Sequence, residues 1–248
     1  MALTELGSAA EVLVATGHDP FARGTLRRPI AQGWLRGAAV AWLGIDPRDG
    51  NSYLHALGTP VTVGALITEL VPELPRVQRA TLPRGSAAHL PAWVGHAGVD
   101  WDFRWLDTPL PVRAQDPDVG AVEDDPAVAA LLAAGNPDAS VRPGDPQARR
   151  WWGVRDRDGS LTACAADTSA ATAVGHLSAV TVRPDRRGRG LGRAVTVALT
   201  NDLLGQGCDV VTLGMYSANT AARALYDALG FADTHHFTSG PLTVRGQW

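Results

Sequence analysis

The sequence has 248 residues, a formal net charge of −3 and 45% hydrophobic residues, which is typical of a soluble globular protein and argues against a general nucleic-acid binder with a strongly basic surface. All 22 basic residues are arginine, because the chain contains no lysine, so Schiff-base, P-loop lysine and lysine-base chemistry are excluded. The two cysteines, Cys164 and Cys208, are too few for a disulfide framework and predict a reducing compartment.

The first half is predicted to mix helices and strands. Apolar periodicity and turn residues indicate, in chain order, a helix over 3–14, strands over 38–45 and 53–57, a helix over 61–70, and strands over 77–82 and 101–106. Residues 107–118 hold three prolines and little apolar periodicity. This segment is therefore predicted to be a linker between two domains.

The second half has a clearer pattern. We expect a helix over 119–134, a hairpin of 151–155 with 161–167, a strand over 175–182, a helix over 190–205, a strand over 210–216, a helix over 220–229 and final strands from 231–238. A hairpin followed by alternating strands and helices predicts an α/β or α+β fold with helices on a mixed sheet.

The most informative segment is residues 180–195, where a strand passes through a glycine-rich loop into a helix. Gly188, Gly190 and Gly192 allow close backbone approach, and free amides at a helix amino terminus favour an anion. Five arginines add positive charge: Arg183, Arg186, Arg187, Arg189 and Arg193. The pattern indicates a pyrophosphate site. The Walker A and Rossmann motifs do not fit, whereas a solvated Arg-rich turn and a nucleic-acid patch remain alternatives.

Two ordered motifs resemble those of the GNAT-type N-acetyltransferase superfamily. The first is Arg187-x-x-Gly190-x-Gly192, preceded by Val180-x-Val182-x-Pro184; the second runs from Asn219 through Leu225-Tyr226 to Gly230-Phe231. The resemblance covers about residues 113–240. It implies a mixed, mostly antiparallel sheet flanked by helices.

The resemblance also implies an activity and a cofactor site. The activity is that of an acyltransferase that moves an acetyl group from acetyl-CoA, as co-substrate, to a primary amine, with no metal. The cofactor-binding residues it implies are Val180, Thr181, Val182, Arg187, Gly188, Arg189, Gly190, Leu191, Gly192, Arg193 and Asn219. Asn219 is also a natural helix N-cap. The alternative function is that of a non-catalytic acyl-CoA-binding sensory or regulatory module. A weaker alternative is an RNA- or protein-bound accessory factor.

Two side chains are candidates for catalysis. Tyr226 matches the tyrosine that many family members place near the thioester sulfur, where it acts as an acid; its alternative is packing beneath the sheet. Many members carry a glutamate base on the strand before the loop, but here His176 is the only titratable residue on that strand. A half-buried, hydrogen-bonded histidine is the alternative, and Asp167 and Glu123 are lesser candidates for the base.

The domain prediction is an amino-terminal domain over 1–112 and a catalytic domain over 113–248. The first is interpreted as a degenerate acetyltransferase-like copy, with an unrelated cap as the alternative. No apolar run approaches the roughly 18 residues of a membrane span, and residues 1–15 do not have the pattern of a signal peptide. We expect a cytoplasmic monomer or homodimer that binds a small-molecule or peptide amine, but no nucleic acid or membrane. The acceptor itself cannot be read from the sequence.

Overall fold

The computed structural model describes residues 2–26, 32–45, 51–74, 77–170 and 173–245. Its elements are β1 (Thr4–Leu6), α1 (Ala9–Ala15), α2 (Pro20–Thr25), β2 (Gln32–Arg36), β3 (Ala39–Ile45), β4 (Ser52–Leu57), α3 (Pro60–Leu70), β5 (Arg79–Pro83), η1 (Ser86–His89), β6 (Val94–His96), β7 (Val99–Leu106), β8 (Gly120–Val122), α4 (Asp125–Gly135), β9 (Arg150–Arg155), β10 (Leu161–Asp167), β11 (Val174–Val182), η2 (Pro184–Arg186), α5 (Leu191–Gly205), β12 (Val210–Tyr216), α6 (Thr220–Leu229), β13 (Asp233–Gly240) and β14 (Leu242–Val244).

Contacts divide the chain into two compact units. Unit 1 comprises Met1–Phe103, Met215–Asn219 and Thr234–Trp248, and unit 2 comprises Arg104–Gly214 and Thr220–Asp233. The carboxyl-terminal strands belong to unit 1 because β13 pairs antiparallel with β5, with Phe237 opposite Pro83. These contact-based units do not test the predicted domain boundary near residue 112, which stays a prediction.

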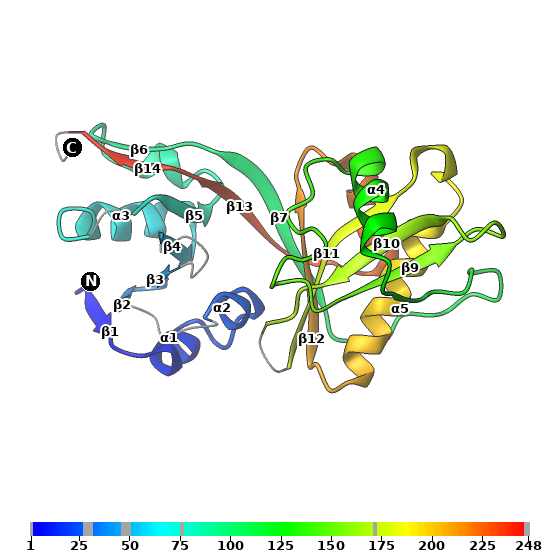
Figure 1. Cartoon of the computed structure of the whole chain (residues 1–248). Coiled ribbons are helices and arrows are strands. Elements are labelled where there is room, and N and C mark those ends of the chain that lie inside the picture. Colours follow the sequence, from blue (N-terminus) through cyan, green and yellow to red (C-terminus); the bar gives the residue numbers. More distant parts are fainter. Residues whose placement is uncertain (1, 27–31, 46–50, 75–76, 171–172, 246–248) are drawn as a thin grey trace. The chain divides into compact units, whose positions relative to one another are not determined.

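Unit 1 is built on a sheet whose strands run in the order β1-β2-β3-β4-β5-β13 (Figure 1). Neighbours pair antiparallel from β1 to β4, whereas β4 and β5 are parallel and joined by α3. Helix α3 packs on one face, where its buried side chains join Trp34, Leu43 and Leu54 in the main core. Val12 of α1 meets Gly33 on the other face, as the alternation of side chains along β2 requires.

The first predicted helix, over 3–14, is shorter in the structure and follows a strand. Residues Thr4–Leu6 form β1, and α1 begins only after Ser8. The Ser8 hydroxyl accepts a hydrogen bond from the Glu11 amide, and the Glu11 carboxylate accepts one from the Ser8 amide. This reciprocal capping box places the helix start at residue 9, so the longer helix predicted from periodicity was wrong at its amino-terminal end.

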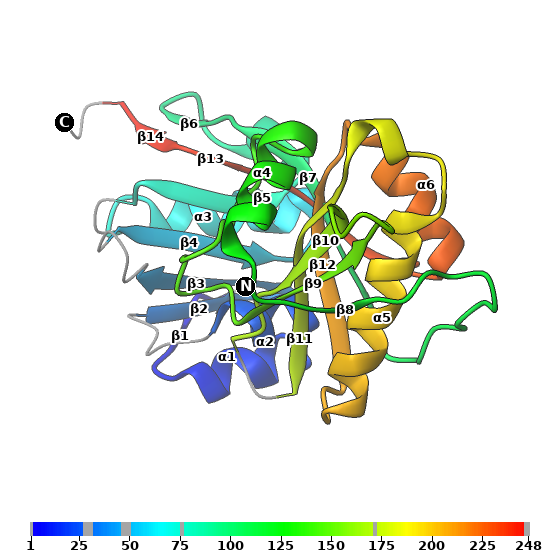
Figure 2. The same ribbon diagram turned by 45° about the vertical axis from the view of Figure 1, so that its right-hand side comes forward.

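Unit 2 contains strands in the order β12-β11-β10-β9-β8. These strands pair antiparallel except for β11 and β12, which are parallel and joined by α5. Helix α4 packs on one face of β10 and β11 and α5 on the other (Figures 1 and 2). A mixed, mostly antiparallel sheet flanked by helices confirms the predicted fold class.

Two segments of unit 2 differ from their predictions. The expected helix over 119–134 is split into β8 and α4, because the Asp124 carboxylate caps the helix by accepting from the Ala127 amide and Pro126 occupies its first turn. The expected linker, 107–118, is held against α5. Asn201 there donates to the Leu110 carbonyl at 2.8 Å and accepts from its amide at 2.7 Å.

The two units share one topology. In each, four strands follow one another antiparallel, and a helix then leads from the fourth strand to a parallel fifth strand: β1-β2-β3-β4-α3-β5 in unit 1 and β8-β9-β10-β11-α5-β12 in unit 2. In both units the fourth strand also extends beyond the last residue that pairs with the parallel fifth strand. The ladder ends at His55–Thr81 in unit 1 and at Leu177–Leu213 in unit 2, among the described pairs.

Candidate functional site

The site of unit 2 begins where β11 leaves β12. The parallel ladder joins Val174–Leu177 to Val210–Leu213, and β11 then continues alone on that side as far as Val182 in the described pairing. A strand without a ladder partner on one side presents backbone donors and acceptors to a ligand. The predicted cofactor-binding residues Val180, Thr181 and Val182 lie in this part of β11.

A β-bulge interrupts the other side of the same strand. Thr181 pairs with Cys164 and Ser178 with Ala166, so Ala179 and Val180 together face a single residue of β10. Ala179 has φ 52°, a left-handed conformation that is uncommon for alanine. Bulges often occur beside active sites, where they redirect backbone groups. The sequence carries no turn signal at Ala179, and the prediction missed the bulge.

The loop after β11 has the geometry of an anion site. Gly188 and Gly190 have φ 75° and 78°, and a Cβ added to either would find no atom within 4 Å. Gly190 is the N-cap of α5 and gives no side-chain cap, so the first amides of this helix are available to a ligand. Leu191 and Gly192 form the first turn, and a Cβ on Gly192 would lie 3.5 Å from Val182 Cγ2.

Two of the five loop arginines are neutralised by aspartates. Arg183 Nε donates to Asp185 Oδ1 at 2.7 Å, and Arg186 Nη2 donates to Asp156 Oδ2 at 2.6 Å. A backbone hydrogen bond from Arg157 and the Arg186 guanidinium lower the pKa of Asp156, so this carboxylate stays ionised. These arginines hold the loop against the β9–β10 hairpin.

The other three arginines differ in what they can offer a ligand. The Arg193 guanidinium forms a largely buried ion pair with Asp116, with Nη1 2.5 Å from Oδ2. The side chain of this predicted cofactor-binding residue therefore holds the segment that packs on α5. Arg187 is exposed and donates to the Gly135 carbonyl at 2.9 Å, which leaves its charge uncompensated. Arg189 is also exposed. The loop thus offers two free positive charges rather than the five expected from the sequence.

His176 lies on β11 inside the closed part of the ladder. Its Nδ1 is 2.7 Å from the Thr212 hydroxyl, which donates its own proton to the Gly175 carbonyl at 2.8 Å. The hydroxyl has one proton, so His176 Nδ1–H must be the donor to Thr212. Neutral His176 therefore carries the Nε2 lone pair that a base requires. Thr212 was not predicted as the partner of His176, because only the strand register brings the two residues opposite each other.

The lesser candidates for the base are placed differently. Asp167 is buried and forms an ion pair with Arg150, with Oδ2 3.1 Å from Nε. It also accepts from the Ser169 amide at 2.9 Å, which uses the carboxylate to hold the end of β10. Glu123 is exposed beyond the end of β8. Neither carboxylate lies on β11.

Tyr226 lies on α6 with 5% of its surface exposed. Its ring meets Phe231 edge to face, with the centroids 5.8 Å apart. Burial raises the pKa of Tyr226 to about 12, and the hydroxyl is protonated at neutral pH, as it would be at the ordinary tyrosine pKa of about 10. Asn219 directly precedes α6, at the position expected of a cap, and it belongs to unit 1.

Two further features bear on function. No group of three or more histidine, cysteine or carboxylate side chains that could hold a metal ion occurs among the described residues. Within those residues, no helix is both long and apolar enough to cross a membrane.

Sequence comparison finds a matching family and similar proteins. Residues 152–238 match the family described as FR47-like protein. A mycothiol acetyltransferase from Kocuria rhizophila is 46% identical over 63 residues, 25% of this chain and 21% of that protein. Another from Thermobispora bispora is 48% identical over 58 residues, 23% of this chain and 20% of that protein. The matched stretch spans about a fifth of the length of these relatives.

Structural comparison covers nearly the whole chain. A GCN5-related N-acetyltransferase from Sphaerobacter thermophilus has a TM-score of 0.57 and 18% identity, over 96% of this chain and 94% of that one. A protein of the same description from Kribbella flavida has a TM-score of 0.55 and 19% identity, over 95% of each chain. At these identities the likeness concerns the fold.

Proposed function

We propose that residues 152–238 form a GNAT-type acetyltransferase domain and that this protein transfers an acetyl group from acetyl-CoA to a primary amine. The observation that carries the proposal is the uncapped amino terminus of α5 behind two left-handed glycines that open to free space. The alternative of a non-catalytic acyl-CoA sensor is not favoured, because the matching relatives are named as enzymes.

The loop residues would bind the pyrophosphate of acetyl-CoA. Amides from Gly188 to Gly192 supply the donors and the α5 dipole favours negative charge, while Arg187 and Arg189 add two exposed cations. Backbone groups of Val180–Val182 would hold the pantetheine arm along the open side of β11. The resemblance to the superfamily supports this part of the proposal.

The chemistry requires two proton movements. The amine nitrogen attacks the thioester carbonyl carbon, so a C–N bond forms and the C–S bond breaks. The proton lost by the amine is assigned to His176 Nε2, because Thr212 holds the Nδ1–H tautomer. The proton gained by the departing thiolate is assigned to the Tyr226 hydroxyl, because Tyr226 matches the tyrosine of the family motif and is protonated at neutral pH.

The acceptor class is inferred from the relatives. Two proteins that are similar to part of this chain are named mycothiol acetyltransferases, which favours a small-molecule acceptor over a protein side chain. We also propose that the protein is cytoplasmic and is a monomer or a homodimer. The shared topology supports the interpretation of unit 1 as a degenerate copy of the acetyltransferase fold.

The proposal is tested by the release of free CoA thiol from acetyl-CoA over a panel of primary amines, including aminosugars, amino acids and arylalkylamines. We expect release that depends on the amine and saturates with it. The chain has no lysine, so acetylation of its own side-chain amines adds no background. Tight binding of acetyl-CoA without release for any amine would favour the sensor instead.

A further inference from the structure

Unit 1 contains a cavity of about 490 Å³, a size typical of small-molecule sites. It is lined where β4 and β5 end, by Leu57 and Pro83, and by α1, α2, β3 and β13. In the topology shared by the two units, the ends of β4 and β5 correspond to those of β11 and β12, where unit 2 carries its glycine loop. The cavity therefore occupies the site position of the unit that lacks the loop.

This cavity is not built for a phosphate. Only Gly58 and Thr59 separate β4 from α3, and the Thr59 hydroxyl caps the helix by accepting from the Thr62 amide. Pro60 at the first helical position has no amide to donate. The amino terminus of α3 thus has fewer amide donors to offer than that of α5, and a CoA pyrophosphate is not expected here.

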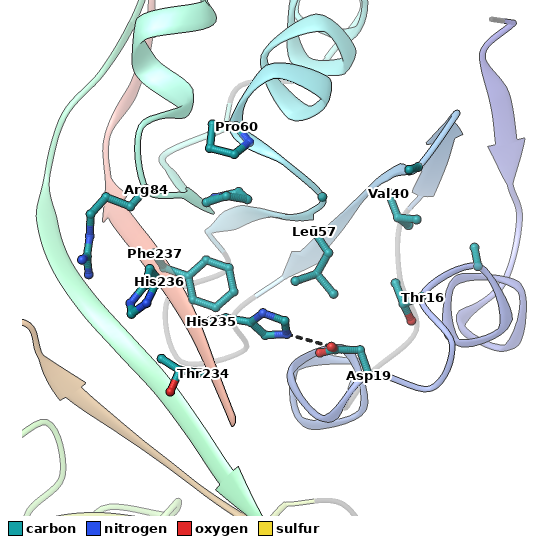
Figure 3. Close-up of a pocket in the computed structure, with 14 residues that line it drawn as sticks. Thr16, Asp19, Val40, Leu57, Pro60, Arg84, Thr234, His235, His236 and Phe237 are labelled. Atoms are coloured by element: carbon teal, nitrogen blue, oxygen red, sulfur yellow. Dashed lines mark hydrogen bonds and ion pairs between the residues drawn. The ribbon is translucent and has the colours of Figure 1, made fainter. Parts of the chain in front are cut away.

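The one arginine among the lining residues is already neutralised. Arg84 Nη2 lies 2.7 Å from Asp102 Oδ1, and Arg84 Nε lies 3.4 Å from Asp100 Oδ2. Figure 3 shows Arg84 and His236 on the opposite side of β13 from Asp19 and His235. Two carboxylates against one guanidinium leave no free positive charge on that side to attract an anion.

The polar group that faces the cavity is a carboxylate beside an imidazole. Asp19 Oδ2 lies 2.7 Å from His235 Nε2, and Asp19 Oδ1 accepts from the Phe21 amide at 2.8 Å (Figure 3). The Asp19 side chain keeps 16% of its surface exposed and that of His235 keeps 29%, so a ligand can reach both. A carboxylate has about four acceptor positions, of which these two bonds use two. Apolar side chains, including Val40 and Leu57, line the same cavity together with Thr16 and Thr234.

We propose that this cavity binds a small primary amine, whose ammonium group donates to Asp19 and whose apolar body lies against Val40, Leu57 and Phe237. A carboxylate in a partly apolar cavity, whose one lining arginine is already paired with Asp100 and Asp102, selects a cation with an apolar body over a neutral or anionic molecule of the same shape. The proposal does not depend on acetyl transfer, because the groups involved belong to unit 1 alone.

Binding of 2-phenylethylamine to the full chain without acetyl-CoA tests the proposal by isothermal titration calorimetry. Its neutral and anionic isosteres, 2-phenylethanol and 3-phenylpropanoate, are the ligand controls. We expect the amine to bind at least about tenfold more tightly than either, as one charge-assisted hydrogen bond provides. Equal binding of the three, or no binding of the amine, would overturn the proposal.

The variant Asp19→Asn separates charge from folding. Asparagine is as good an N-cap as aspartate, so its side-chain oxygen still accepts from the Phe21 amide and α2 is preserved. Amine affinity should fall about tenfold or more, while the melting temperature stays within a few degrees. Glu69→Gln, which removes an exposed carboxylate of the same unit paired with Arg36, is the matched control and should bind the amine as the wild type does. Unchanged affinity in Asp19→Asn would refute the assigned contact.

Discussion

Gly190→Ala should separate loop geometry from general stability. Gly190 has φ 78°, and a Cβ there would meet no protein atom within 4 Å, so the new methyl group enters the open space assigned to the pyrophosphate. The left-handed conformation costs alanine about 1–2 kcal/mol, which for a chain of this size corresponds to a fall in melting temperature of about 2–8 °C. Loss of one charge-assisted hydrogen bond to phosphate should weaken acetyl-CoA binding by about 10- to 100-fold.

Gly207→Ala is the matched control for this variant. Gly207 follows the other end of the same helix, has φ 93° and likewise leaves a Cβ with no atom within 4 Å. Both variants should lose similar stability by calorimetry, but only Gly190→Ala should raise the Kd for acetyl-CoA in equilibrium titration. Equal acetyl-CoA affinities in the two variants would refute the placement of the pyrophosphate on this loop.

Further predictions concern the acid, the base and the half-buried His55. Tyr226→Phe should lower kcat about 100-fold and leave the Kd for acetyl-CoA unchanged. In the wild-type protein, ionisation of Tyr226 should not lower kcat below about pH 11, because burial raises the pKa of Tyr226 to about 12. Thr212→Val should lower kcat about tenfold in stopped-time assays by releasing the Nδ1–H of His176, and Thr212→Ser should restore it; a Val variant of normal kcat would contradict this positioning role. Burial lowers the pKa of His55 to about 4, against about 6.5 in the unfolded chain, so the unfolded state takes up the proton first and stability falls as pH decreases from 6.5 to 4. Urea titrations should show a loss of at most about 3 kcal/mol over that range, which His55→Gln should reduce; an equal slope in both proteins would count against this assignment.

The regular elements of unit 2 were largely predictable, because long apolar periods and a glycine-rich loop are local signals. The strand-loop-helix around Gly190 and the strand that follows it are present as expected. The Ser8-x-x-Glu11 pattern was also a readable capping box, and periodicity alone overextended that helix.

Other features depend on contacts between distant residues. The pairing of Arg193 with Asp116 turned an expected linker into a packed segment, and no local pattern joins positions 77 residues apart. No local pattern predicts the ion pair of Arg186 with Asp156 either. This pair neutralises one of the five arginines that were expected to face the phosphate. The bulge at Ala179 has no compositional signal, since alanine rarely takes a left-handed conformation.

Unit 2 is proposed to transfer an acetyl group to an amine nitrogen. The most direct measurement incubates the protein with acetyl-CoA carrying an isotopic label in the acetyl group and a reactive amine from the panel, and locates the label by mass spectrometry. We predict that the label appears in an amide on the amine, at a rate that falls in Tyr226→Phe. Label that remains in acetyl-CoA, or leaves only as acetate whatever amine is present, would contradict the claim.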